Sequence, residues 1–153
     1  MSMTGLPVFD TTVQKTNTWV NDLAAELGWD DKHRAFQGLR VTLHALRDRL
    51  TAEEAAHLGS QLPILIGGFY YENWKPATNP SKERSKEEFL GHIRQYFESI
   101  QPPESSDIGF DVERLVRAVF KILTQRVSQG EIADVVQMLP PELRDLWPQQ
   151  VSN

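Results

Sequence analysis

The chain has 153 residues, of which 40% are hydrophobic and 24% charged, and this composition is typical of a folded globular protein. It contains no cysteine, which excludes disulfides, thiolate zinc sites and cysteine nucleophiles. The net charge of −5 argues against nucleic-acid binding, which depends on contacts between basic side chains and phosphates. No apolar run approaches the roughly 20 residues that cross a bilayer, and no secretory signal opens the chain. We therefore expect a cytoplasmic protein with no membrane partner.

The first half of the sequence carries four helix patterns. A capping box at 11–14 precedes apolar residues at near-helical spacing, and Gly28 supplies a left-handed residue that ends a helix. Apolar residues then recur at intervals of three and four from 36 to 50. A second capping box at 51–54 predicts a short helix, and Pro63 predicts the first turn of another.

The second half begins after a polar stretch, 72–84, in which prolines interrupt the helical periodicity. Capping boxes at 85–88 and 128–131 predict two helix starts, and an apolar stripe at 112–127 predicts a helix between them. A proline pair at 140–141 introduces a short last helix. No segment shows the alternation typical of a strand, so the sequence predicts an all-α fold.

The two halves superimpose under a single shift of 77 positions. We therefore predict two tandem helical repeats, each of three helices plus a short fourth, packed with approximate twofold symmetry because units of this size have small cores. The predicted boundaries are 8–76 for the first repeat, 77–84 for a linker, 85–148 for the second repeat and 149–153 for a C-terminal tail. The shift matches Leu39, Leu43, Leu46 and Leu50 with Val116, Phe120, Leu123 and Val127, Thr51 and Glu54 with Ser128 and Glu131, and Arg40 and Arg49 with Arg117 and Arg126.

One stretch resembles a known family. Residues 61–76 read QLPILIGGFYYENWKP, and residues 82–90 read KERSKEEFL. These motifs, above all Tyr-Tyr-x-x-Trp-x-Pro and the helix start that follows, resemble the bacterial family known as domain of unknown function 2267. The likeness runs from about 13 to 147 and includes the duplicated layout. It implies a fold class and a bacterial cytosolic origin, and it implies no activity, cofactor or catalytic residue.

The segment around the predicted linker combines aromatic and basic side chains. Such a combination can anchor a protein partner, or it can stack bases and neutralise phosphates. The alternative is that the aromatic rings pack over the seam between the repeats while the basic groups are solvated. The partner-binding candidates are Tyr70, Tyr71, Trp74, Lys75, Lys82, Arg84 and Lys86.

A metal site is a further alternative. Glu54 and His57 have the E-x-x-H spacing of di-iron helical bundles, and the shift places them opposite Glu131 and Asp134. Both glutamates, however, occupy capping-box positions, where their carboxylates should turn back to the helix start. The core stripes also offer no further inward glutamate. We therefore predict no metal site and keep these four residues as the alternative.

Four arginines recur at matching places in the two halves: Arg40, Arg49, Arg117 and Arg126. We expect them to pair with acidic groups at helix ends or between the halves, with anion capture as the alternative. No nucleophile elbow, P-loop or dinucleotide-binding glycine pattern occurs, so no catalytic residue or cofactor is predicted. The favoured function is a non-enzymatic protein-binding or assembly module. The alternatives are a carboxylate/His metal-binding protein or enzyme, and a binder of nucleic acid or a phosphate ligand.

Overall fold

The computed structural model describes residues 3–102, 104–105 and 107–149, so the predicted tail lies outside it beyond its first residue. Every regular element in this part of the chain is a helix, which confirms the predicted all-α class. The elements are α1 (Pro7–Leu27), α2 (Lys32–Arg49), α3 (Ala52–Ser60), α4 (Ile64–Tyr70), the 3₁₀ turn η1 (Pro76–Thr78), α5 (Lys86–Ser99), α6 (Val112–Arg126), α7 (Gln129–Met138) and α8 (Pro141–Arg144).

Local sequence signals account for several of the helix ends. α1 stops at Gly28, which adopts φ 71° and donates its N–H to carbonyls of the last turn, as predicted. α5 begins with a complete capping box, in which the Ser85 hydroxyl accepts the N–H of Glu88 and the Glu88 carboxylate accepts the N–H of Ser85. These ends are decided by residues within one turn of each other.

The start of α1 differs from the prediction. The helix begins at Pro7 and not at the expected capping box of 11–14. A proline in the first turn costs no hydrogen bond, because the N–H at that position has no partner in the helix. The hydroxyl of Thr12 instead accepts a hydrogen bond from the N–H of Leu65 in α4, at 2.9 Å. The second threonine of that motif therefore joins two helices.

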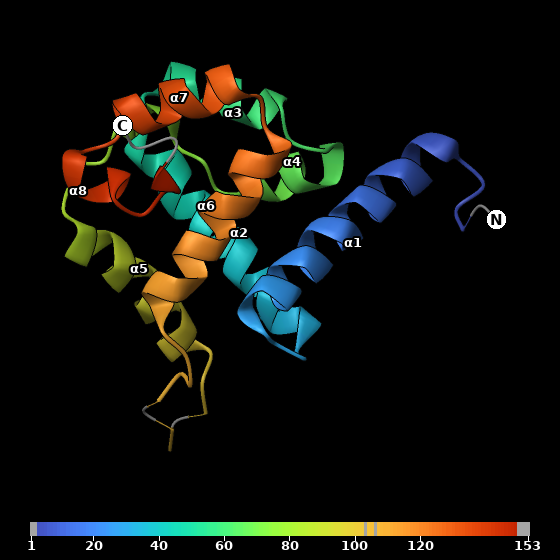
Figure 1. Cartoon of the computed structure of the whole chain (residues 1–153), viewed down its shortest axis with the longest axis horizontal. Coiled ribbons are helices and arrows are strands. Elements are labelled where there is room, and N and C mark those ends of the chain that lie inside the picture. Colours follow the sequence, from blue (N-terminus) through green and yellow to red (C-terminus); the bar gives the residue numbers. More distant parts are fainter. Residues whose placement is uncertain (1–2, 103, 106, 150–153) are drawn as a thin grey trace.

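One continuous core joins the two halves of the chain. α1 packs on α2 and α6, α2 packs on α5 and α6, and α3 lies against α7. Figure 1 shows α3 and α7 side by side at one end of the molecule, with α6 crossing α2 at its centre. Because each of these interfaces except α1–α2 pairs a helix of the first half with one of the second, the halves bury their apolar faces against each other.

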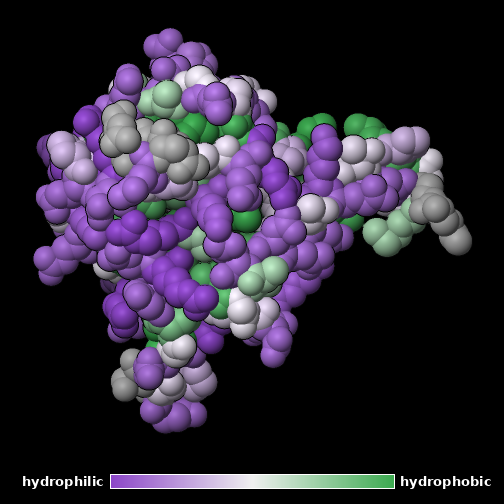
Figure 2. Space-filling model, in the orientation of Figure 1, coloured by the Kyte–Doolittle hydropathy of each residue, from purple (hydrophilic) through white to green (hydrophobic). Residues whose placement is uncertain are grey.

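The first turns of α1 project from the rest of the molecule (Figure 1). Val8 and Phe9 are exposed, and the residues that α1 buries begin only at Thr16. Figure 2 shows apolar surface along this projecting end. In the part of the chain that the structure describes, no helix combines the length and the apolar character needed to cross a membrane.

Candidate functional site

The three aromatic residues of the predicted partner-binding segment lie at different depths. Tyr70, at the end of α4, is fully buried, and its hydroxyl donates to the carbonyl of Ala55 at 2.6 Å. Tyr71 is 38% exposed, whereas Trp74 packs against the core and donates its indole N–H to the Asn79 side chain at 2.9 Å. Only Tyr71 and the outer part of Trp74 therefore contribute to the surface.

The basic residues of the same segment divide into two groups. Lys75, Lys82 and Arg84 are exposed and form no ion pair with any residue that the structure describes. Lys86 instead lies in the first turn of α5 and pairs with Glu113 of α6 at 3.2 Å. Lys86 therefore helps to join two helices, and the other three cations face solvent.

The four recurring arginines pair with acidic side chains, as predicted. The guanidinium of Arg40 makes two hydrogen bonds, of 2.7 and 2.9 Å, with the carboxylate of Glu72. Such bidentate contacts are the strongest form of this interaction. The remaining pairs are Arg49 with Glu83, Arg117 with Glu113 and Asp145, and Arg126 with Asp22.

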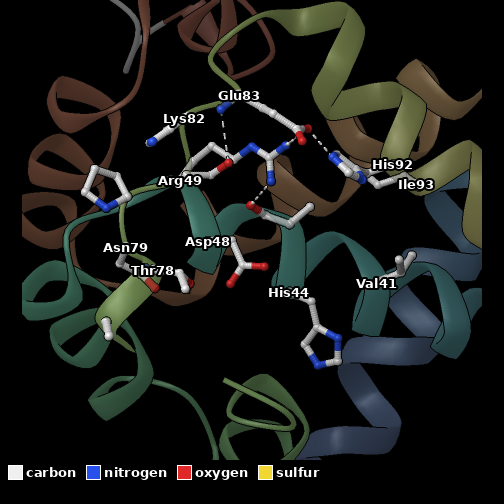
Figure 3. Close-up of a pocket in the computed structure, with 14 residues that line it drawn as sticks. Val41, His44, Asp48, Arg49, Thr78, Asn79, Lys82, Glu83, His92 and Ile93 are labelled. Carbon is white, nitrogen blue, oxygen red and sulfur yellow. Dashed lines mark hydrogen bonds and ion pairs between the residues drawn. The ribbon is translucent and has the colours of Figure 1, made fainter. Parts of the chain in front are cut away.

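A pocket of about 680 Å³ lies between α2, the segment 77–83 and the middle of α5. Figure 3 shows that Arg49 lies along its wall, with Glu83 and His92 next to it. The side chain of Arg49 is only 4% exposed. Its Nη1 donates a long hydrogen bond of 3.4 Å to the carbonyl of Ala45, while Nε and Nη2 have no hydrogen-bond partner among the described residues.

Glu83 supplies the negative charge opposite this buried guanidinium. Its Oε2 lies 3.6 Å from Nη2 of Arg49 and also contacts Nε2 of His92. The guanidinium carbon lies 5.3 Å from the centre of the Phe89 ring. Burial lowers the pKa of Arg49, and the charges of Glu83 and Asp48 oppose this effect. Arg49 nevertheless stays protonated, because an arginine pKa begins far above neutrality.

His44 lines the same pocket from α2. Burial lowers the pKa of His44, and this effect outweighs a hydrogen bond to a backbone carbonyl that raises it. The ring is therefore neutral at pH 7, and its Nε2 donates to the carbonyl of Phe69 at 2.6 Å. This hydrogen bond thus ties the end of α4 to α2.

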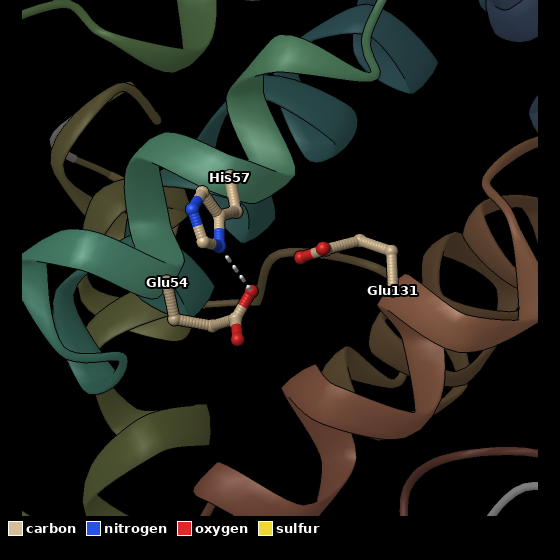
Figure 4. Close-up of side chains that lie close together, drawn as sticks. All are labelled: Glu54, His57 and Glu131. Atoms are coloured by element: carbon tan, nitrogen blue, oxygen red, sulfur yellow. Dashed lines mark ion pairs between the residues drawn. The ribbon is translucent and has the colours of Figure 1, made fainter.

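Two carboxylates face each other where α3 packs on α7. Figure 4 shows Glu54 and His57 on α3 and Glu131 on α7, with the three side chains directed toward one another. Glu54 is 7% exposed and Glu131 is 8% exposed, and the Oε2 atom of each has no hydrogen-bond partner among the described residues. One ligand atom from each of the three side chains lies within 4.8 Å of the others. His57 lies on the outer side, 3.9 Å from Glu54.

The environment of this pair favours a neutral carboxyl group. Burial, hydrogen bonding to Glu54, and the charges of Glu54 and Asp134 together raise the pKa of Glu131 to about 8. Two carboxylates at this distance cannot both be ionised without a large penalty, so in the absence of a cation they share one proton.

The sequence argument against this site was wrong about where these carboxylates point. Thr51 and Ser128 do accept the N–H groups of Glu54 and Glu131, but only this half of each capping box forms. Because α3 and α7 pack side by side, the carboxylates meet across the interface and do not return to their own helix starts. Asp134, the fourth candidate ligand, is exposed and lies outside the cluster that the described residues form.

Residues 16–146 match the family described as an uncharacterized conserved protein, DUF2267, and the chain belongs to this family. The resemblance read from the sequence is therefore confirmed. No curated protein matches the chain. The family description assigns no activity, so any function has to be argued from the two polar clusters described above.

The pocket cluster of Arg49, Glu83 and His92 was not predicted as a site. Arg49 was recognised as one of four recurring arginines, for which anion capture was the alternative to pairing with acidic groups. Glu83 and His92 are nine positions apart, one in the connecting segment and one in α5. No periodicity in the sequence therefore predicts that they are neighbours. Only the packing of the segment against α2 and α5 brings the three side chains together.

Proposed function

We propose that this protein binds a divalent transition-metal ion between α3 and α7, with Glu54, His57 and Glu131 as ligands. The observation that supports the proposal is the pair of buried carboxylates, each with an oxygen that no described residue satisfies. Buried like charges are costly unless a proton or a cation stands between them. A divalent ion neutralises both carboxylates and uses their unpartnered oxygens.

The donor set suits particular ions. Two carboxylates and an imidazole are ligands that Zn²⁺, Mn²⁺ and Fe²⁺ all accept. The ligand atoms lie within 4.8 Å of one another, whereas the ligands of a tetrahedral ion stand about 3.4 Å apart for bonds of about 2.1 Å. Side-chain rotation closes this difference, and His57 has room to rotate because its side chain is 61% exposed. Three protein ligands leave at least one coordination position for water.

We also propose that Glu54 and Glu131 are equivalent residues of two tandem helical repeats with approximate twofold symmetry. They lie 77 positions apart, and each is the third residue of a helix capped by a hydroxyl, that of Thr51 or Ser128. The proline caps of α4 and α8 have the same separation. Equivalent residues near a twofold axis approach each other, so a duplication explains why one sequence position supplies both carboxylates.

Metal binding is tested by calorimetric titration of chelator-treated protein with Zn²⁺ and with Mn²⁺. We expect one ion per chain, and Glu131→Gln should weaken the affinity by about 100-fold or more, because loss of a supporting contact alone costs 10- to 100-fold. Glu53→Gln is the matched control, since it removes the same charge from an exposed residue adjacent to Glu54. Its affinity should stay within about twofold of the wild type.

Two results would count against the metal site. The first is the absence of saturable binding by the wild-type protein with either ion. The second is equal binding by the wild type and Glu131→Gln, which would place the ion elsewhere. Unfolding does not confuse the comparison, because the glutamine replaces a carboxyl group that is neutral in the metal-free protein and should not destabilise the helix pair.

The protein-binding module predicted from the sequence is a second candidate, and its partner would be an acidic protein surface. It is favoured by the exposed cations Lys75, Lys82 and Arg84, which are unpaired within the described residues and lie close in sequence to Tyr71. Tyrosine, tryptophan and arginine side chains are enriched where proteins bind each other. A triple charge reversal, K75E/K82E/R84E, should abolish binding of a purified partner that the wild type retains. Retention of that partner by the triple variant would contradict this candidate.

A further inference from the structure

The wall of the large pocket holds a buried cation whose hydrogen-bonding capacity is unused. Arg49 is nine-tenths buried or more, and two of its three guanidinium nitrogens lack a hydrogen-bond partner among the described residues. Guanidinium groups present several donors in a fixed fork that matches the two oxygens of a carboxylate or phosphate. Leaving such donors buried and unsatisfied is costly. The position is therefore suited to an oxyanion.

Glu83 lies next to the guanidinium of Arg49 but does not satisfy its free hydrogen-bond donors. At 3.6 Å, the distance from its Oε2 to Nη2 of Arg49 is too long for a good hydrogen bond. The same oxygen contacts His92, so the carboxylate lies between a guanidinium and an imidazole (Figure 3). Glu83 belongs to the connecting segment between η1 and α5, and its side chain is 43% exposed. It can leave the pocket without disturbing a helix.

We propose that this pocket binds a small oxyanion, a carboxylate or a phosphate, whose charged group replaces the Glu83 carboxylate between Arg49 and His92. The segment 77–83 adds the polar residues Thr78 and Ser81 to the pocket lining. Ile93 and Val41 supply apolar surface for the rest of a small organic ligand.

The charges around the pocket agree with this assignment. With the Glu83 carboxylate displaced, the residues that line the pocket include the cations Arg49 and Lys82 and one acidic residue, Asp48. Asp48 is itself held by the guanidinium of Arg47, which donates from Nε at 2.9 Å. The site is thus positive once Glu83 has left, and this site shares no residue with the proposed metal site.

In this arrangement Glu83 acts as a tethered competitor for the ligand. A group on a short segment has an effective concentration in the millimolar range, so a free anion must displace it. Removing the carboxylate should therefore strengthen anion binding by about tenfold or more. A gain in affinity is the opposite of the usual effect, because deleting a residue that lines a site normally weakens binding.

The experiment compares the wild type with Glu83→Ala in titrations with inorganic phosphate and with succinate, followed by NMR shifts of the histidine rings. We expect Glu83→Ala to bind one or both probes about tenfold more tightly, with the largest shift at His92. The probe that binds shows whether the pocket accepts a phosphate or a carboxylate. The control Glu87→Ala removes an exposed acidic residue that does not line the pocket, and its affinity should match the wild type.

Adding Arg49→Lys to Glu83→Ala should abolish the gain, because lysine lacks the guanidinium fork. If that double variant does not fold, His92→Gln in the Glu83→Ala background serves the same purpose, since His92 is half exposed. The proposal is overturned if Glu83→Ala binds both probes no more tightly than the wild type. It is equally overturned if the gain persists without Arg49 or His92, or if Glu87→Ala shows the same gain.

Discussion

Replacing Glu131 with glutamine should remove a pH dependence that the buried carboxylate pair imposes on folding. In metal-free protein at neutral pH, the pair shares one proton, and ionising both groups is opposed by burial and by their mutual repulsion. A glutamine amide donates a hydrogen bond to Glu54 at every pH and carries no charge. The variant keeps the shape of the α3–α7 interface but loses the titrating group.

The magnitude follows from the raised pKa. A carboxyl group whose pKa rises from 4.5 to about 8 on folding binds more protons in the folded state than in the unfolded state throughout this interval. Its stabilising contribution is complete below pH 4.5 and is lost as the pH rises through about 8. The free energy of unfolding then falls by up to about 1.4 kcal/mol per pH unit. Between about pH 6 and about pH 8 we expect a loss of about 2 kcal/mol.

The assay is urea denaturation at these two pH values, with a chelator present, for the wild type, Glu131→Gln and the control Glu53→Gln. Other groups titrate in the same range: the lowered pKa of His44 makes stability rise with pH. That contribution is common to all three proteins and cancels when they are compared. Wild type and Glu53→Gln should lose about 2 kcal/mol more than Glu131→Gln. Equal losses in all three would refute the shared proton.

Two substitutions beside this interface test its packing. Tyr70→Phe removes a buried hydroxyl and its hydrogen bond to the carbonyl of Ala55, so it should lower the free energy of unfolding by about 1 to 2 kcal/mol in urea denaturation. A change below about 0.3 kcal/mol would show that the hydrogen bond is replaced by water. Gly59→Ala improves helix propensity but places a Cβ against the Tyr71 hydroxyl and 2.9 Å from the Tyr70 ring. It should destabilise by about 1 to 3 kcal/mol, and an increase in stability would contradict the close packing.

Much of the helical architecture could be read from the sequence, because its signals act over one or two turns. The left-handed Gly28 and the capping box at Ser85 each depend on neighbours only a few residues away. Apolar spacing likewise predicted helices across 36–50 and 112–127. The start of α1 was misplaced because the threonines at 11 and 12 look like a capping motif in the sequence, whereas they lie inside the helix and Thr12 contacts α4.

The polar clusters were harder to predict, since the direction of a long side chain depends on what lies opposite it. Glu88 and Glu131 occupy the same position relative to their hydroxyl caps, yet only Glu88 turns back to its helix start. Glu88 faces solvent, whereas Glu131 faces Glu54 on a neighbouring helix. Local sequence cannot distinguish these two cases.

The order of the helices, several of their ends and the family were thus contained in the sequence itself, because propensity, capping and periodicity are local properties. The tertiary structure alone decided which charges are buried and what they meet. It brought Glu54 close to Glu131, and it brought Glu83 close to both Arg49 and His92. Both outcomes arise from contacts between segments distant in the chain, where burial turns ordinary surface charges into groups that need a proton or a counter-ion.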